Sequence, residues 1–231
     1  MKFRMVKLST KALYILILFC AVHAAATAQN QTDTASGVRG ALSQGAEAAV
    51  SKLGMVGGFM NNPAVKIPLP EPLKSAEKIL KMAGLNKQAQ GLVEKMNTAA
   101  ETAVPLAKPI LIDAIKKITL SDAKSILSGG DTSVTTFFKS KTQQNLQAAL
   151  LPIVKKTTDT VGLAQQYNTL ASKAAPLGLI KGDATNIERY VTGKTLDGLY
   201  HLIAEEEKKI RSNPLAAASS AVQAIFAGLK K

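Results

Sequence analysis

Apolar residues recur with a helical period from Lys194 to Pro214, the longest stretch of the chain that keeps one phase. At about 100° per residue, five of its large apolar side chains fall on one side of a helix and are expected to face a core. They are Leu196, Leu199, Tyr200, Ile203 and Ile210. Of three consecutive glutamates in this stretch, Glu205 points away from the core, Glu206 lies on the flank and Glu207 falls inside the apolar stripe. Glu207 is therefore the one misplaced charge of the predicted helix.

The position of Glu207 allows two interpretations. In the first, the carboxylate reaches water near the helix end, or pairs with Arg211 or a basic residue of another helix, as structural ion pairs do. In the second, Glu207 is a half-buried acid that serves proton transfer or cation binding, which makes it the catalytic candidate of this chain. The pattern alone leaves both interpretations open.

Similar apolar stripes predict helices along most of the chain. Cap residues, glycines and prolines mark where they start and stop. Two glycines inside the first of them, Gly40 and Gly45, lower its helical propensity. The first predicted helices run from Ser36 to Gly54, from Pro72 to Gly84, from a cap at Asn86 to Ile118, from a capping box at Thr119 and Asp122 to Gly129, and from Val134 to Gly162. A further helix places Leu163, Tyr167, Leu170 and Ala174 together on its inner side and ends near Pro176-Leu177-Gly178. The last helix begins at Asn213-Pro214 and carries one inward stripe of Leu215, Ala218, Val222, Ile225, Phe226 and Leu229.

Three prolines are expected to interrupt two of these helices. Pro105 and Pro109 kink one helix or split it in two, and Pro152 bends another. A further irregularity precedes the Lys194–Pro214 stretch, which is approached from Asp183 or Asn186. Its first apolar residues point roughly opposite to the stripe if the helix is continuous across a glycine. Either the helix breaks at that glycine or its first turns meet a different neighbour; the residues concerned are Ile187, Tyr190, Val191 and Gly193.

The segment from Gly57 to Leu73 contains four prolines in ten residues, at positions 63, 68, 70 and 72. This density forbids a helix and favours an extended strap. Val65, Ile67 and Leu69 alternate, so one side of the strap can lie on the helical body, and this segment is the one that could pair as a strand. The predicted fold class is therefore all-α: an irregular multi-helix bundle with proline-kinked helices and one extended Pro-rich strap at about residues 57–72.

The first 28 residues are organised like a secretory signal. Four basic residues precede an apolar stretch from Ala12 to Val22, and Ala26-Thr27-Ala28 supplies the small residues of a cleavage site. We predict cleavage after Ala28, a disordered leader at 29–36, and a single helical domain at 37–231 in the periplasm. Processing removes the only cysteine of the sequence, which leaves no disulfide, no thiolate nucleophile and no cysteine metal site.

The charge of the chain is strongly positive. Removing residues 1–28 takes away four of the 29 basic residues and none of the 16 acidic ones, which leaves a net charge of about +9. The excess is spread evenly, the sequence has no tryptophan, and no aromatic residues alternate with arginines as a stacking platform requires. We therefore expect no nucleic-acid partner, and a general attraction to anionic envelope surfaces. We expect no transmembrane segment after the signal is removed.

Asp197, His201 and Glu205 are spaced at i, i+4 and i+8, which can place two carboxylates and an imidazole along one ridge as metal ligands. The same ridge is the solvent side of the helix, where such residues form exposed stabilising pairs. The other histidine, His23, belongs to the signal, so we predict no His/His or Ser/His/Asp catalytic set in the mature chain. We expect no cofactor.

The composition favours a binding role. Proline-kinked helices rich in aliphatic side chains leave grooves between them, and the strap could close one with Val65, Ile67 and Leu69. Tyr200 and Arg211 are further binding candidates. We predict a non-enzymatic periplasmic envelope binding or interaction protein, whose partner is an envelope protein or a lipid.

Two other hypotheses stay open. A hydrolase or cation-dependent enzyme would use Glu207 with another buried carboxylate, although nothing in the sequence shows that two acids meet. Alternatively, the last helix, residues 215–229, mediates oligomerisation or membrane contact.

Four segments of the chain form a specific series: NNPAVKIPLPEPL (61–73), NTAAETAVPLAKPI (97–110), AIKKITLSDAKSIL (114–127) and YVTGKTLDGLYHLIAEEEKKIRSNPLA (190–216). In this order they resemble the bacterial domain-of-unknown-function 4197 family, and the similarity runs from about Gly37 to Leu229. The resemblance implies an exported, helical bacterial protein of about this length. It implies no activity, ligand or catalytic residue.

Overall fold

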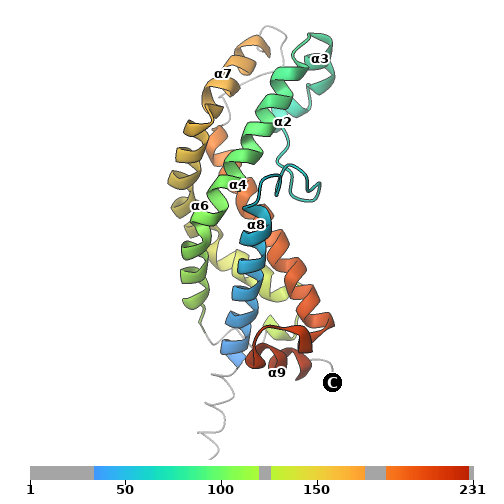
Figure 1. Cartoon of the computed structure of the whole chain (residues 1–231), viewed down its shortest axis with the longest axis vertical. Helices are drawn as coiled ribbons and strands as arrows, with labels where there is room; N and C mark the ends of the chain where they lie inside the picture. The colour runs from blue at the N-terminus through green and yellow to red at the C-terminus, as the bar shows by residue number, and fades with distance from the viewer. Residues whose placement is uncertain (1–33, 120–125, 175–185, 229–231) are drawn as a thin grey trace, which may run out of the picture.

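The computed structural model describes residues 34–119, 126–174 and 186–228. Within these ranges the chain forms helices joined by turns and loops, with no β-strand, which confirms the all-α class. Figure 1 shows an elongated arrangement of these helices. They comprise an N-terminal helix at 34–53, α2 Glu71–Lys74, α3 Glu77–Met82, α4 Asn86–Lys116, α6 Ser133–Thr160, α7 Leu163–Ala174, α8 Ile187–Ser212, the 3-10 turn η3 Pro214–Ala216, and α9 Ser220–Gly228.

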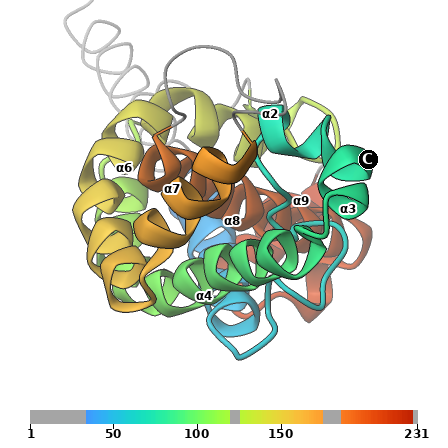
Figure 2. The same ribbon diagram turned by 90° about the horizontal axis from the view of Figure 1, so that it is seen from above.

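The long helices α4, α6 and α8 form the centre of the fold. Each contacts the other two, and Figure 2, seen along the long axis, shows them around a common core. The apolar stripe of α8 is buried as predicted, with every one of its five side chains at most 3% exposed. The same holds for α7, whose predicted inward residues are all buried: Leu163, Tyr167, Leu170 and Ala174.

The helix at 34–53 packs alongside α8. It crosses α8 closely, because a Cβ added to Gly45 would lie only 3.4 Å from the Cα of Ile203. Near its start, a Cβ on Gly40 would come within 2.7 Å of the Cγ2 of Val222 in α9. The two glycines that lower its helical propensity therefore permit close packing. Residues 34–36, which we expected in the leader, form its first turn.

The strap continues the path of this helix along the bundle, between α4 and α8. Turns occupy most of residues 54–65, and only 66–70 run without turns or helix. The alternating side chains Val65, Ile67 and Leu69 are buried as predicted, yet the segment pairs with no described strand. Helix 34–53 and the strap thus contact the same two helices, α4 and α8, one after the other along the bundle.

The prolines leave their helices unbroken. α4 runs as one 31-residue helix through Pro105 and Pro109, and α6 continues through Pro152. All three prolines are exposed, so water can satisfy the carbonyl groups that lose their helical N–H partner. The alternative of a split helix is therefore wrong. Asn86 is the first helical residue and does not cap α4, because Leu85 occupies the cap position.

α8 is continuous across Gly193. Asn186 caps it, and its side-chain oxygen accepts the Arg189 N–H at 2.8 Å. The alternative of a break at Gly193 is therefore wrong. The strap covers the first turns, where the Tyr190 hydroxyl donates to the carbonyl oxygen of Pro68 at 3.0 Å. It also reaches the later turns, since a Cβ on Gly198 would lie 3.5 Å from Val65.

The C-terminal prediction needs correction. Asn213 ends α8, Pro214 opens a 3-10 turn, and α9 starts only at Ser220. Leu215, expected to point inward, is 77% exposed, since the 3-10 turn shifts the helical phase. Val222 and Phe226 of α9 are buried as predicted.

Several predicted features lie outside the described residues: the signal, most of the leader, the Asp122 half of the capping box, the helix end near Pro176-Leu177-Gly178, Asp183 and Leu229. Among the helices that are described, none has the length and apolarity needed to cross a bilayer.

Candidate functional site

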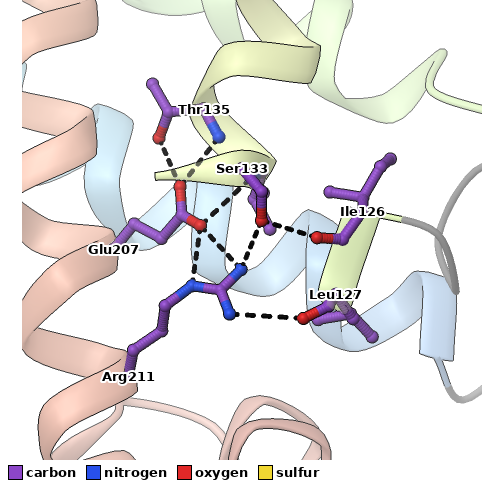
Figure 3. Close-up of polar contacts among 7 residues, drawn as sticks. Ile126, Leu127, Ser133, Thr135, Glu207 and Arg211 are labelled. Atoms are coloured by element: carbon purple, nitrogen blue, oxygen red, sulfur yellow. Dashed lines mark hydrogen bonds and ion pairs between the residues drawn. The ribbon is translucent and has the colours of Figure 1, made fainter. Parts of the chain in front are cut away.

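Glu207 of α8 caps the first turn of α6 (Figure 3). Its Oε1 accepts the Val134 N–H at 3.0 Å, and its Oε2 accepts the Thr135 N–H at 2.8 Å and the Thr135 hydroxyl at 2.7 Å. The first N–H groups of a helix have no partner within it and carry partial positive charge. A carboxylate from a helix 72 residues further along the chain therefore does the work of a local cap.

Arg211 completes this cluster. Its Nε and Nη2 lie 2.9 Å from Oε1 of Glu207, Nη2 also donates to the Ser133 hydroxyl at 2.7 Å, and Nη1 donates to the Leu127 carbonyl at 3.3 Å. The guanidinium stands 5.2 Å from the ring centroid of Phe226. Figure 3 shows these side chains converging where α6, α8 and residues 126–127 meet. The pair joins four segments, because Phe226 belongs to α9.

Glu207 pairs with Arg211, as the ion-pair interpretation predicted, but the carboxylate is buried and does not reach water. Only 3% of its side chain and 13% of the Arg211 side chain are exposed, whereas we expected the carboxylate to reach water. Both carboxylate oxygens are bonded to protein donors, so the group offers little surface to a substrate. The described residues also contain no group of three His, Cys, Asp or Glu side chains that could hold a metal ion.

A second buried cluster fixes the strap to α4. Asn97 is fully buried; its side-chain oxygen accepts the Ile67 N–H at 2.9 Å, and its Nδ2 donates to the Ile67 carbonyl at 2.9 Å and to the Val93 carbonyl at 2.7 Å. An amide can donate and accept at once, so this side chain takes the place of a neighbouring strand. The strap thereby satisfies its backbone without joining a sheet.

Glu101, one turn further along α4, holds the loop before the strap. Its carboxylate accepts the N–H groups of Gly57, Phe59 and Met60, each at 3.0 Å. Glu101 is 7% exposed, and Gly57 adopts φ +81°, which favours glycine. Glu101 thus caps a loop of another segment and not a helix of its own.

A cleft of about 550 Å³ follows the outer face of α8, between the strap and the first turns of α6. Val65 and Tyr200, two predicted binding residues, line it. The Tyr200 hydroxyl lies 3.0 Å from that of Thr142, and burial raises the pKa of the Tyr200 phenol. The other binding candidates lie elsewhere: Ile67 is fully buried, Leu69 lines a cleft on the other side of the strap, and Arg211 pairs with Glu207.

The three residues proposed as metal ligands contact two different partners. The Asp197 carboxylate lies 3.0 Å from Lys139 Nζ of α6, and His201 Nε2 lies 3.4 Å from Glu205. About half of each of the Asp197, His201 and Glu205 side chains is exposed. The His201–Glu205 contact fits the exposed-pair interpretation of the ridge, whereas Asp197 pairs with a lysine of another helix.

Lysines from three elements line the same cleft: Lys66 from the strap, Lys139 from α6 and Lys194 from α8. The Lys139 ammonium stands 5.5 Å from the Tyr200 ring centroid, and the Lys194 ammonium stands 5.9 Å from that of Tyr190. The Lys139 contact holds its ammonium group against a ring that lines the cleft, whereas Tyr190 is not a lining residue. Asp197 is the only carboxylate among the described lining residues, so the cleft carries an excess of positive charge.

Sequence reasoning missed Asn97 and the three lysines. Asn97 and Glu101 lie four residues apart in phase with the apolar stripe of α4, so two polar side chains facing the core were a detectable signal. The lysines carry no such signal, because they are far apart in the chain and each is ordinary in its own helix or loop.

Comparison with known proteins gives one match. No curated protein sequence and no solved structure matches this chain. A family model described as "Protein of unknown function (DUF4197)" matches residues 28–227, which include both buried clusters and every described helix apart from the last residue of α9. The chain therefore belongs to the DUF4197 family.

Proposed function

We propose that the protein is a non-enzymatic binding protein of the bacterial envelope, and that it holds an anionic group of its ligand in the cleft along α8. The observation that carries the proposal is the meeting of Lys66, Lys139 and Lys194, from three different elements, in one hollow of about 550 Å³. A hollow with an excess of one sign of charge concentrates ligands of the opposite sign.

The chemistry of the lining favours a phosphate- or carboxylate-bearing ligand. Lysine ammonium groups bind anions as point charges, and the hydroxyl groups of Thr132 and Thr136, which also line the cleft, can donate hydrogen bonds to anionic oxygens. Lys139 already pairs with Asp197. Lys66 and Lys194 therefore supply the charge that remains for a ligand.

The rigid strap supports a binding role. Asn97 and Glu101 of α4 bind backbone groups of residues 57–67 by hydrogen bonds. Tyr190 of α8 binds the Pro68 carbonyl from the other side of the strap. One wall of the cleft is thereby held in place before a ligand arrives, which lowers the entropic cost of binding.

Thermal unfolding with inorganic phosphate tests the proposal. Phosphate should raise the melting temperature, by about 2–4 °C for each kcal/mol of binding free energy in a chain of this size. The double variant Lys66→Gln/Lys194→Gln should lose the increase. The matched control is Lys155→Gln, which removes a lysine of α6 that pairs with Asp159 outside the cleft, and should keep it.

A second arm separates the two anion classes. Citrate in place of phosphate should stabilise the protein less if the cleft prefers phosphate, and more if it prefers carboxylates. The proposal fails if neither anion shifts the melting temperature, or if Lys155→Gln abolishes the shift as fully as the cleft variant does. The predicted export is checked separately by N-terminal sequencing of the protein from the periplasmic fraction, where Gln29 should be the first residue.

A further inference from the structure

Three large apolar side chains are exposed near the loop that follows helix 34–53. Met55 is 61% exposed, Val56 is fully exposed and Leu106 of α4 is 52% exposed. Gly54 lies against Pro105, since a Cβ on Gly54 would be 2.8 Å from the Pro105 ring. Met55 follows Gly54 in the chain, and Leu106 follows Pro105. We call Met55, Val56 and Leu106 the apolar tip.

The apolar tip is held on a rigid base. Glu101 binds the N–H groups of Gly57, Phe59 and Met60 directly behind it, and the Gly58 N–H donates to the Met55 carbonyl at 2.9 Å. The Phe59 ring is fully buried. Val56 is therefore presented to solvent by a loop whose neighbouring residues are fixed, although burying it would be favourable.

The surroundings of the tip carry little negative charge. Residues 51–62 include one lysine, Lys52, and no carboxylate. On α4, the exposed positions between 98 and 109 are Thr98, Thr102, Pro105, Leu106, Lys108 and Pro109, of which only Lys108 is charged. Lys108 pairs with Glu47 at 3.3 Å, and Glu101, the other charged residue of this stretch, is buried.

We propose that the apolar tip inserts into the surface of an anionic lipid bilayer. A stable protein dimer buries about 800 Å² on each partner, which three protruding side chains do not supply. Lipid insertion has no such threshold, because each apolar group that enters the acyl boundary adds to binding, and lysines near the surface add attraction to anionic headgroups. The positive net charge of the chain acts in the same direction.

A single-tryptophan experiment tests the proposal. The sequence contains no tryptophan, so Val56→Trp creates one reporter at the tip. It is made in the chain of residues 29–231, because the predicted signal is itself apolar and every described contact lies within 34–228. With vesicles of phosphatidylcholine and phosphatidylglycerol in equal amounts, its emission should shift to the blue and be quenched by brominated lipid. The matched control is Met82→Trp, at a methionine of α3 that is 79% exposed, and its emission should not change.

Loss of the tip should weaken binding. In flotation with the same vesicles, Met55→Ser/Val56→Ser should bind about tenfold more weakly or worse than the unaltered chain, since each buried apolar side chain contributes to partition. Vesicles of phosphatidylcholine alone should bind less protein than the mixed vesicles. Circular dichroism confirms that the variant is folded, which is expected because both side chains are exposed.

Three outcomes would overturn the proposal: equal emission shifts for the two tryptophan variants, no shift in either, or unchanged flotation of the serine variant. Lys66→Gln/Lys194→Gln in the same assay separates the tip from the proposed cleft. If this variant alone loses vesicle binding, the cleft and not the tip contacts lipid. If phosphate binding fails while the tip variants behave as expected, the tip proposal stands without the cleft.

Discussion

Two buried glutamates hold the molecule together, and each does so differently. Glu207 on α8 accepts two backbone N–H groups and a hydroxyl, and pairs with Arg211. Glu101 on α4 accepts three backbone N–H groups, and no described basic side chain pairs with it. Each carboxylate accepts backbone N–H groups of another segment: Glu207 those of the first turn of α6, and Glu101 those of residues 57–60.

The difference lies in what each glutamate connects. Glu207 and Arg211 tie α6, α8, α9 and residues 126–127 at one junction, so their loss should affect the stability of the whole domain. Glu101 holds a loop and the base of the strap, so its loss should act mainly on that region. The comparison teaches that backbone N–H groups alone can satisfy a buried carboxylate at a loop, whereas the four-segment junction also uses a buried cation.

The largest effect is expected for Glu207→Ala. Removing one partner of a buried pair leaves Arg211 uncompensated, which costs about 3–5 kcal/mol of unfolding free energy. Urea unfolding followed by circular dichroism measures this. Glu205→Ala, which removes only an exposed pair with His201, should cost less than about 0.5 kcal/mol. Adding Arg211→Met to Glu207→Ala should restore part of the loss, and a double variant as unstable as the sum of both singles would contradict the pairing.

Glu101→Ala should have the next largest effect. It leaves the buried Phe59 N–H and two partly buried N–H groups without an acceptor, at a cost of about 2–3 kcal/mol. Hydrogen exchange should speed up at residues 57–60 more than in α6. The neighbouring variant Thr102→Ala, at an exposed position of the same helix, is the control. Uniform acceleration across the domain would show that the two glutamates do not differ as described.

A smaller loss of stability is expected when a methyl group is added to α8 at Gly198, which faces the loop before the strap. A Cβ at Gly198 would lie 2.6 Å from Cε1 of Phe59, whose ring is fully buried, so Gly198→Ala should destabilise by about 1–2 kcal/mol. Gly193→Ala in the same helix meets no atom within 4 Å and should stabilise by up to about 1 kcal/mol through helix propensity. Thermal unfolding of both variants checks the opposite signs, and equal signs would disprove the close contact.

The smallest effect is a pH dependence of the strap. Burial, followed by the charge of Glu71, raises the pKa of Tyr190 to about 12 from 10.0. Between these values the unfolded chain releases the phenolic proton and the folded chain keeps it, so stability should fall as pH rises from 10 to 12. Absorbance at the phenolate band should reveal late-titrating tyrosines, because burial raises the pKa of Tyr200 as well, and Tyr190→Phe should remove the step near pH 12. A Tyr190 that titrates near 10 would mean that the strap does not cover it.

The sequence predicted which side chains of α8 need a polar partner, but it did not predict which residues of other helices supply one. The position of Glu207 in an apolar stripe indicated a partner, and Arg211 one turn away was the correct one, because i, i+4 neighbours share a helix face. Thr135 and Val134 could not be identified as its other partners, since they lie on another helix. The spacing of Asp197 and His201 is compatible with metal ligands on one helix face. In the structure Asp197 instead pairs with Lys139 of α6, which its spacing along α8 could not indicate.

The sequence by itself determined where most of the helices lie and that Val65, Ile67 and Leu69 are buried, because these depend on local periodicity and on proline's missing N–H. Only the tertiary structure decided between Asp183 and Asn186 as the start of α8, that Asn97 would serve the strap as a strand partner and that three lysines would meet at one cleft. It also made Gly40, Gly45 and Gly198 points of close contact. Those outcomes depend on how the helices cross, and a crossing is set by contacts between residues tens of positions apart, which no local pattern records.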